Sequence, residues 1–193
     1  MRRLAYGAIA LGLVAIVAIG LLQSGGGGGQ EESAGVSATE AQERLAGAPP
    51  ALAALHEQAN ELLPGGADAV QARLEELRGH PVVLNGWASW CGPCRYEFPA
   101  FQEAALELGK EVAFVGLDAG DVQEDARAFL DEFPISYPSY EDPDFKAVEA
   151  LKAPRGLPFT LFIDAEGEVA YIHQGQYTDT AALVADVRRY AMG

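Results

Sequence analysis

Two cysteines three residues apart, Cys91 and Cys94, are the only thiols in the 193-residue chain. A secreted protein stabilised by disulfides would carry more cysteines, spread along its length. Two sulfurs also cannot supply the four ligands of a structural zinc site. A pair at this spacing is typical of thiol–disulfide exchange, in which one thiolate attacks a disulfide and a second thiol releases the product. The sequence therefore predicts redox chemistry at this pair, with inert or metal-binding cysteines as the alternative.

The surroundings of the pair favour the redox interpretation. A short β-branched run over residues 81–85 precedes it, and a helix is predicted from about Cys94 to Leu108. Free amides and the positive dipole end of a helix favour an anion and lower the pKa of a thiol placed there. We therefore expect Cys91 to be the nucleophile at an exposed tip and Cys94, one turn deeper, to resolve the mixed disulfide. Pro93 is tolerated in a first helical turn and stiffens the loop.

The two tryptophans near the motif have different predicted roles. Trp87 lies in the apolar run and is expected in the core, whereas Trp90 directly precedes Cys91 and is expected to shield the disulfide and contact partners. The three histidines, His56, His80 and His173, are scattered and are interpreted as surface residues.

A second signal is the segment from Gly156 to Phe159, which contains Pro158 and comes immediately before a predicted strand. Proline lacks a donor for the ladder and is tolerated mainly at the first residue of a strand. Taken alone, the segment indicates an ordinary trans proline, because cis bonds are uncommon even before proline.

The wider pattern predicts an α/β sandwich with a mixed sheet, because strands and helices alternate before a final hairpin and helix. Gly167 can take the positive φ that the hairpin turn requires. We expect strands over residues 81–85, 112–117, 137–140, 160–163 and 169–172, and helices over 68–78, with Asp68 as cap, 94–108, 122–133, 143–151 and 178–192.

Residues 4–22 form an uncharged apolar run preceded by Arg2 and Arg3. As a helix this run rises roughly 28 Å, about the hydrocarbon thickness of a bilayer. A cleaved signal peptide is the alternative, but it usually has a shorter run and an A-x-A-like site, which is not evident here. The sequence therefore predicts a retained signal anchor over residues 1–23, with the remainder extracytoplasmic.

Beyond the anchor, five consecutive glycines mark a flexible linker over residues 24–39. A helical extension is predicted over residues 40–65, as helix from about residue 41 to 63 with a break near Pro49 and Pro50. Residues 66–193 form the folded domain. The chain beyond the apolar run carries 11 basic and 28 acidic residues, which argues against nucleic-acid binding. A solvated acidic surface is the simplest interpretation, and attraction of basic partners is the alternative.

The run VVLNGWASWCGPCRYEF, from Val82 to Phe98, resembles thioredoxin-fold proteins. With the following FPAF, and with the later GLPFTLFIDAEGEV, it resembles the extracytoplasmic TlpA/ResA-like branch over roughly residues 66–192. The resemblance implies a thioredoxin-like three-layer sandwich with a central mixed sheet. It also implies that Pro158 is cis and faces the cysteines, and that the backbone of Leu157 pairs with an extended substrate segment. The expected substrate-binding residues are Trp90, Gly92, Pro93, Leu157 and Pro158.

The chain departs from thioredoxin at two positions. Cytoplasmic thioredoxins carry a buried Asp that serves the second cysteine, and the matching residue here is Asn85, which cannot titrate. The TlpA/ResA-like branch often has a Glu on the active-site helix, and Glu97 matches it, so the resemblance implies that Glu97 manages protons for Cys94. An exposed Glu in the first turns of the helix is the alternative. The other departure is Gly86, where a bulky apolar residue is more usual; room for a neighbouring side chain is the one reason that suggests itself.

The resemblance implies a reductase of exported proteins, with apocytochrome c among the family's substrates and with electrons from a membrane transporter of the CcdA/DsbD type. The Gly-Pro dipeptide between the cysteines resembles the reducing thioredoxins, and no cofactor or metal is expected. One alternative is an oxidase that forms disulfides in secreted proteins. The other is a copper-delivery protein for oxidase assembly that uses both cysteines as soft ligands, although an obvious third ligand is lacking.

Overall fold

The computed structural model describes residues 37–193. The predicted anchor over residues 1–23 and most of the predicted linker over 24–39 lie outside the described residues. Within residues 37–193, no helix combines the length and the apolar character needed to span a bilayer.

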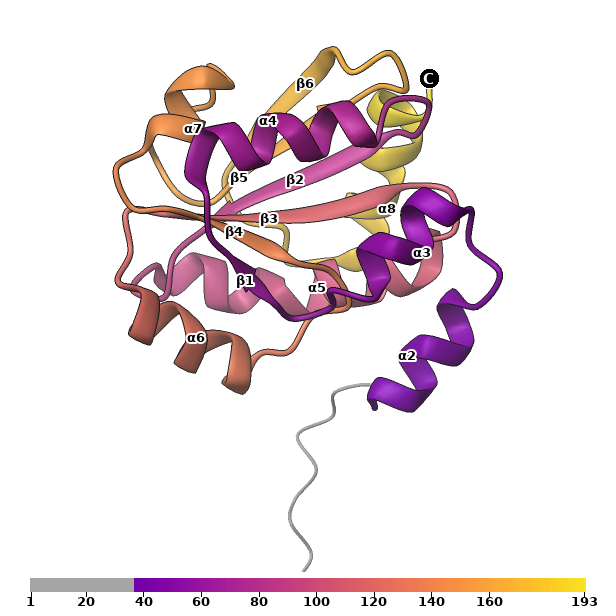
Figure 1. The fold of residues 1–193 in the computed structure, drawn as a ribbon, viewed down its shortest axis with the longest axis horizontal. Helices are drawn as coiled ribbons and strands as arrows, with labels where there is room; N and C mark the ends of the chain where they lie inside the picture. Colours follow the sequence, from indigo (N-terminus) through magenta and orange to yellow (C-terminus); the bar gives the residue numbers. More distant parts are fainter. Residues whose placement is uncertain (1–36) are drawn as a thin grey trace, which may run out of the picture. The chain divides into compact units, whose positions relative to one another are not determined.

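A six-stranded mixed sheet forms the centre of the described chain, in the order β1-β4-β3-β2-β5-β6 (Figure 1). Neighbours among β1, β4, β3 and β2 run parallel, whereas β5 pairs antiparallel with both β2 and β6. The central strands β2, β3 and β5 are buried along their length because helices cover both of their faces. The strands are β1 (Leu62–Leu63), β2 (Val82–Trp87), β3 (Ala113–Ala119), β4 (Ser139–Asp142), β5 (Phe159–Ile163) and β6 (Val169–Gln174).

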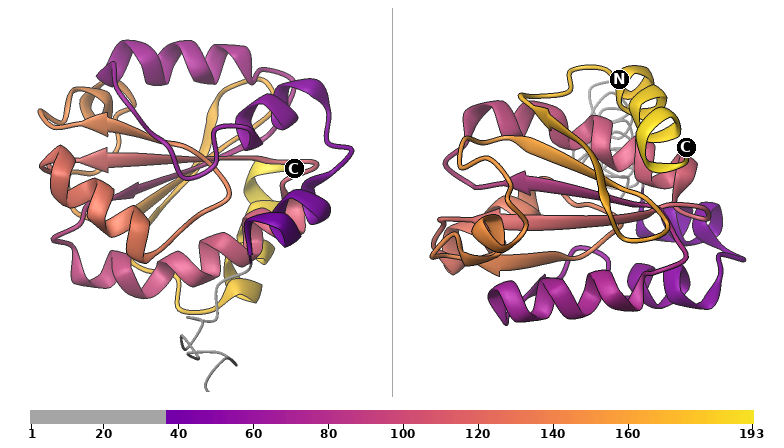
Figure 2. Two further views of the ribbon diagram at one scale, coloured as in Figure 1. Left: turned by 60° about the horizontal axis from the view of Figure 1, so that its bottom comes forward. Right: turned by 90° about the horizontal axis from the view of Figure 1, so that it is seen from above.

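Helices cover the two faces of the sheet, and each face has its own apolar core (Figures 1 and 2). One core contains side chains of α3 (Pro50–His56), α4 (Gly66–Glu76) and α7 (Lys146–Ala150). The other contains side chains of α5 (Gly92–Leu108), α6 (Gln123–Glu132) and α8 (Thr180–Asp186), the last continued by a π-helical turn over Val187–Ala191. The predicted three-layer, thioredoxin-like sandwich with a mixed sheet is thereby confirmed for this part of the chain.

The helix expected from residue 41 to 63 is wrong at its C-terminal end. The structure has α2 (Ala38–Leu45) and α3, but Leu62–Leu63 forms strand β1, which pairs with Ser139 and Tyr140 of β4. A two-residue strand is created by its long-range partner, so the helical spacing of leucines misled the prediction.

The cap expected at Asp68 is also wrong. Helix α4 begins at Gly66, with Gly65 as N-cap at a φ of 114°. Asp68 instead lies in the first turn, where the helix dipole favours an acidic side chain. Gly167 does take a positive φ, 84°, in the turn between β5 and β6, as predicted.

The unusual Gly86 is explained by its neighbour on β5. Gly86 pairs with Phe159, and a Cβ at position 86 would lie 2.3 Å from the Phe159 ring. Phe159 is fully buried and fills the space that a side chain on residue 86 would occupy. The prediction that Gly86 leaves room for a neighbouring side chain is therefore confirmed.

Candidate active site

A disulfide joins Cys91 to Cys94 at the start of α5, with a Cα–Cα distance of 5.3 Å. Cys91 is the N-cap residue, and its Sγ accepts a hydrogen bond from the Cys94 amide at 3.3 Å. This contact places a backbone donor on the sulfur that would carry the charge of a thiolate, which favours the ionised thiol. Cys91 keeps 4% exposure and Cys94 none. The expected order of access is thus present, but the exposed tip consists of Gly92 and Pro93 rather than of Cys91 itself.

The residues that directly follow β3 hold the loop before Cys91. The carboxylate of Asp121 accepts hydrogen bonds from the Ser89 amide and, at 2.9 Å, from the Ser89 hydroxyl. The Trp90 indole N–H donates to the Gly120 carbonyl at 3.0 Å, yet the Trp90 side chain remains 61% exposed. Trp87 is fully buried, so both tryptophan positions agree with the prediction.

The Leu157–Pro158 peptide bond is cis, as the resemblance implied. Pro158 is buried directly before β5, and its carbonyl accepts a hydrogen bond from the Gly175 amide at 3.0 Å. The next residue, Phe159, pairs with Gly86 near the end of β2, which leads into the cysteine loop. The topology therefore brings Pro158 to the edge of the sheet from which the cysteine motif extends.

Glu97 is fully buried, so the alternative of an exposed helix residue is wrong. The Asn85 side-chain amide donates to its Oε1 at 2.8 Å, and the Tyr177 backbone amide donates to its Oε2 at 3.1 Å. Burial raises the pKa of Glu97 to about 8, and the two donors limit the rise because they stabilise the carboxylate. Glu97 can therefore change its protonation state near neutral pH, three residues along the helix from Cys94.

Further polar groups lie on the same face of the sheet as Glu97. Thr160 pairs with Asn85 across β2 and β5, and both side chains are buried. Burial and the charge of Glu97 raise the pKa of Tyr137 well above its ordinary value. The Asn85 Oδ1, Thr160 Oγ1 and Tyr137 hydroxyl atoms have no hydrogen-bond partner within the described part of the chain. These groups make the surroundings of Glu97 more polar than an apolar core.

Sequence reasoning recognised Asn85 only as a residue that cannot titrate and did not identify Tyr177. The hydrogen bonds of both to Glu97 join α5 to residues 12 and 80 positions away. His173, interpreted as a scattered surface residue, is half-buried and stacks on the Tyr177 ring at a centroid distance of 4.2 Å.

Asp118 is a second buried acid that sequence reasoning missed. Its side chain is 3% exposed, and burial, followed by the charge of Asp121, raises its pKa to about 8. Asp118 pairs with Trp87 across β2 and β3, so it lies beside the end of β2, which leads into the cysteine loop. The sequence does contain a signal for this acid. Asp118 and Asp121 follow the apolar run of β3, and the carboxyl ends of parallel strands meet at one edge of a sheet, where functional side chains gather.

Comparison with known proteins identifies relatives of this arrangement. A model described as the AhpC/TSA family matches residues 56–172. The thiol-disulfide oxidoreductase ResA of Oceanobacillus iheyensis is 34% identical over 114 residues, which cover 58% of this chain and 58% of the relative. The thioredoxin-like protein YneN of Bacillus subtilis is 32% identical over 111 residues, which cover 56% of this chain and 64% of the relative. The match thus spans about three fifths of the length of these curated relatives.

Solved structures agree with these matches. One assigned as the thiol:disulfide interchange protein DsbE of Chlorobium tepidum is 30% identical, with a TM-score of 0.56, covering 60% of this chain and 83% of that chain. DsbF of Mycobacterium tuberculosis is 28% identical, with a TM-score of 0.55, covering 60% of this chain and 84% of that chain.

Proposed function

The chain belongs to the AhpC/TSA family, and from this premise we propose that it is a thiol–disulfide oxidoreductase that reduces disulfides in exported proteins. The observation that carries the proposal is the Cys91–Cys94 pair at the start of α5, with the buried Glu97 one turn further along the helix. The relatives' names, ResA and DsbE among them, support the same chemistry.

The proposed reaction begins with the reduced pair. The Cys91 thiolate attacks one sulfur of a substrate disulfide, that S–S bond breaks, and one substrate thiolate leaves. Cys94 then attacks the Cys91 sulfur, which forms the Cys91–Cys94 disulfide and releases the second substrate thiolate. Two electrons pass to the substrate, and its two thiolates take up two protons.

Protein groups assist this exchange at three points. The amide of Cys94 stabilises the thiolate of Cys91. Glu97 accepts the proton of Cys94, since Asn85 cannot. Trp90, Gly92 and Pro93 contact the substrate, and so does the cis Pro158, while the backbone of Leu157 pairs with an extended substrate segment.

The direction of electron flow is proposed from the dipeptide between the cysteines. Gly92 and Pro93 match the reducing thioredoxins, whose reduction potential is about −270 mV, compared with about −120 mV for the oxidant DsbA. Within residues 37–193, no group of three or more His, Cys, Asp or Glu side chains is placed to hold a metal ion. The two alternative functions, disulfide formation and copper delivery, predict a different redox potential and a different copper content, respectively.

A redox titration of the purified domain, with metal analysis of the same sample, tests this proposal. We expect a potential close to the thioredoxin value and no stoichiometric copper. A potential near that of DsbA would show an oxidase, and one bound copper per chain would show a delivery protein.

We also propose that residues 1–23 anchor the chain in the cell membrane as a single-pass segment, with the folded domain extracytoplasmic. A transporter of the CcdA/DsbD type would then return Cys91 and Cys94 to the dithiol form, and apocytochrome c is a candidate substrate. The apolar run over residues 4–22 supports the anchor. Carbonate extraction should leave the full-length chain in the membrane pellet, and a soluble mature form that begins near Gln23 would contradict the anchor.

A further inference from the structure

Exposed apolar side chains gather around the disulfide. Tyr96, Val122 and Trp90 are 74%, 62% and 61% exposed, and no other large apolar side chain in residues 37–193 exceeds 40%. Trp90 precedes Cys91, and Tyr96 lies one helical turn beyond the exposed Gly92. The Val122 amide donates at 2.8 Å to Asp121, the residue that holds the cysteine loop. Apolar groups so exposed beside a reactive pair are typical of a surface that other molecules cover.

Exposed carboxylates lie next to Val122, on and beside the first turn of α6. Glu124 and Asp125 follow Val122 and Gln123 in the first turn of α6, and both are exposed. The Gln123 side-chain amide donates to Glu141, which places Glu141 beside that turn. Asp68 and Asp144 line, with Glu141, an adjoining hollow of about 350 Å³.

Few cations balance these acids. From Asp118 to Glu149 the chain has ten acidic and two basic residues. Lys146, at the edge of the hollow, lies 3.4 Å from Asp144. Arg95, the basic residue closest to the cysteines in sequence, pairs with Glu132 at 2.7 Å and stacks over Phe133. The surface that contains Trp90, Val122, Glu124, Asp125 and Glu141 therefore has an excess of negative charge.

We propose that this surface, formed by Trp90, Val122, Glu124, Asp125 and Glu141, selects substrate segments that carry a Lys or Arg and an apolar side chain beside their disulfide. The apolar side chain covers Trp90 and Val122, and the cation faces the three carboxylates. The inference rests on the proposed function and adds the class of substrate to it.

The preference for cationic substrates is electrostatic, and this determines which kinetic step it affects. A single exposed ion pair contributes only about 0–1 kcal/mol, but several carboxylates of one sign raise the local concentration of a cationic segment and its rate of association. Screening removes this effect, since the Debye length falls from about 10 Å at 0.1 M salt to about 3 Å at 1 M. The preference should therefore lie in the association rate and should depend on salt.

Peptide disulfides of matched length test the inference. Each probe carries one intramolecular disulfide and one Trp, with two flanking positions occupied by Lys, Gln or Glu, and is mixed with the dithiol protein in a single turnover. At low salt we expect the Lys peptide to be reduced about 10-fold faster than the Glu peptide, with Gln between them. At about 1 M salt the three rates should converge.

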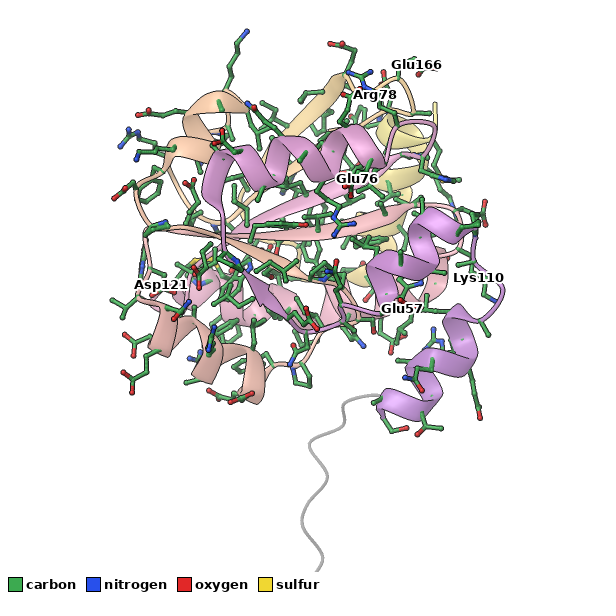
Figure 3. The ribbon with its side chains drawn as sticks, in the orientation of Figure 1. Glu57, Glu76, Arg78, Lys110, Asp121 and Glu166 are labelled. Atoms are coloured by element: carbon green, nitrogen blue, oxygen red, sulfur yellow. A yellow bond between two sulfur atoms is a disulfide. The ribbon has the colours of Figure 1, made fainter. Side chains whose placement is uncertain are left out.

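Two double variants with equal charge change locate the effect. Glu124→Gln/Asp125→Asn should reduce the Lys-to-Glu ratio at least about threefold. Glu57→Gln/Glu111→Gln should leave the ratio unchanged, because Glu57 and Lys110, the neighbour of Glu111, lie across the molecule from Asp121 (Figure 3). Equal rates for all peptides in an active protein, or equal losses in both variants, would overturn the inference. Failure to reduce any peptide would instead contradict the proposed function.

Discussion

Cys94→Ala should leave the protein covalently joined to its substrates. Cys91 can still attack a substrate disulfide, but no second thiol remains to break the mixed disulfide that forms. The burial of Cys94 beneath Cys91 supports this division of roles, because only Cys91 retains any exposure. Diagonal gels of extracts, non-reducing then reducing, should show adducts in Cys94→Ala that thiol reductants release.

Cys91→Ala is the matched variant and should form no adducts. Its turnover should fall by about three orders of magnitude, as expected when the attacking group is removed. The described helix and its packing should remain, since Ala at the N-cap removes only the sulfur's hydrogen bond with the Cys94 amide and a disulfide that spans three residues. Adducts in Cys91→Ala but not in Cys94→Ala would reverse the roles.

Glu97→Gln should change the pH dependence of the second step, the attack of Cys94 on the mixed disulfide. General-base catalysis typically contributes about 10²–10⁴-fold. With the pKa of Glu97 at about 8, only about a tenth of it is ionised at pH 7, so the expected loss at pH 7 is about 10-fold or more. Wild-type rates should rise through an inflection near pH 8, and the variant should lack that inflection. Stopped-flow release of a fluorescent thiol from a preformed mixed disulfide measures this step between pH 5 and 10.

Two further variants separate a proton role from a structural one. Glu103→Gln changes an exposed acid on the same helix, which pairs with Arg44, and should leave the profile unchanged. Asn85→Leu removes the donor to Glu97, so the pKa of Glu97 should rise and the inflection should move to higher pH. A Glu97→Gln profile identical to the wild type would show that water serves Cys94.

The stability of the folded protein should fall with rising pH over the range in which the rate of the second step rises. The pKa of Glu97 is raised by folding, so the folded chain binds one more proton than the unfolded chain between about pH 4.5 and 8. The contribution of Glu97 to stability is therefore lost as pH rises through this window. Glu97→Gln should flatten this pH dependence of the free energy of unfolding, even though it slows the second step.

Local patterns were sufficient to predict most of the elements. The apolar runs of β2, β3 and β5 and the spacing around α5 are properties of short segments. Strand β1 was missed because its two leucines become a strand only through pairing with Ser139 and Tyr140, far along the chain. The cis bond before Pro158 could be expected only from the resemblance, since the local pattern favoured trans.

The chemistry of the site was predictable where it depends on adjacent residues. Cys91 and Cys94 were recognised from their spacing, and Glu97 from the resemblance. The environment that makes Glu97 titrate near neutrality was not predictable, because its partners come from β2 and from the segment before α8. Likewise, Asp121 reaches the cysteine loop, and Asp118 lies beside Trp87, only after β2 and β3 pair.

The close approach of Gly86 and Phe159 couples the residues that these two positions can carry. A bulky residue at position 86 and Phe at position 159 cannot coexist, because even a Cβ at position 86 would lie 2.3 Å from the ring. Loss of the side chain at position 86 with a small residue at 159 leaves only a cavity, at a cost of about 2–5 kcal/mol. The residues at positions 86 and 159 are therefore coupled: a side chain at 86 requires a smaller residue at 159, and glycine at 86 favours a large one.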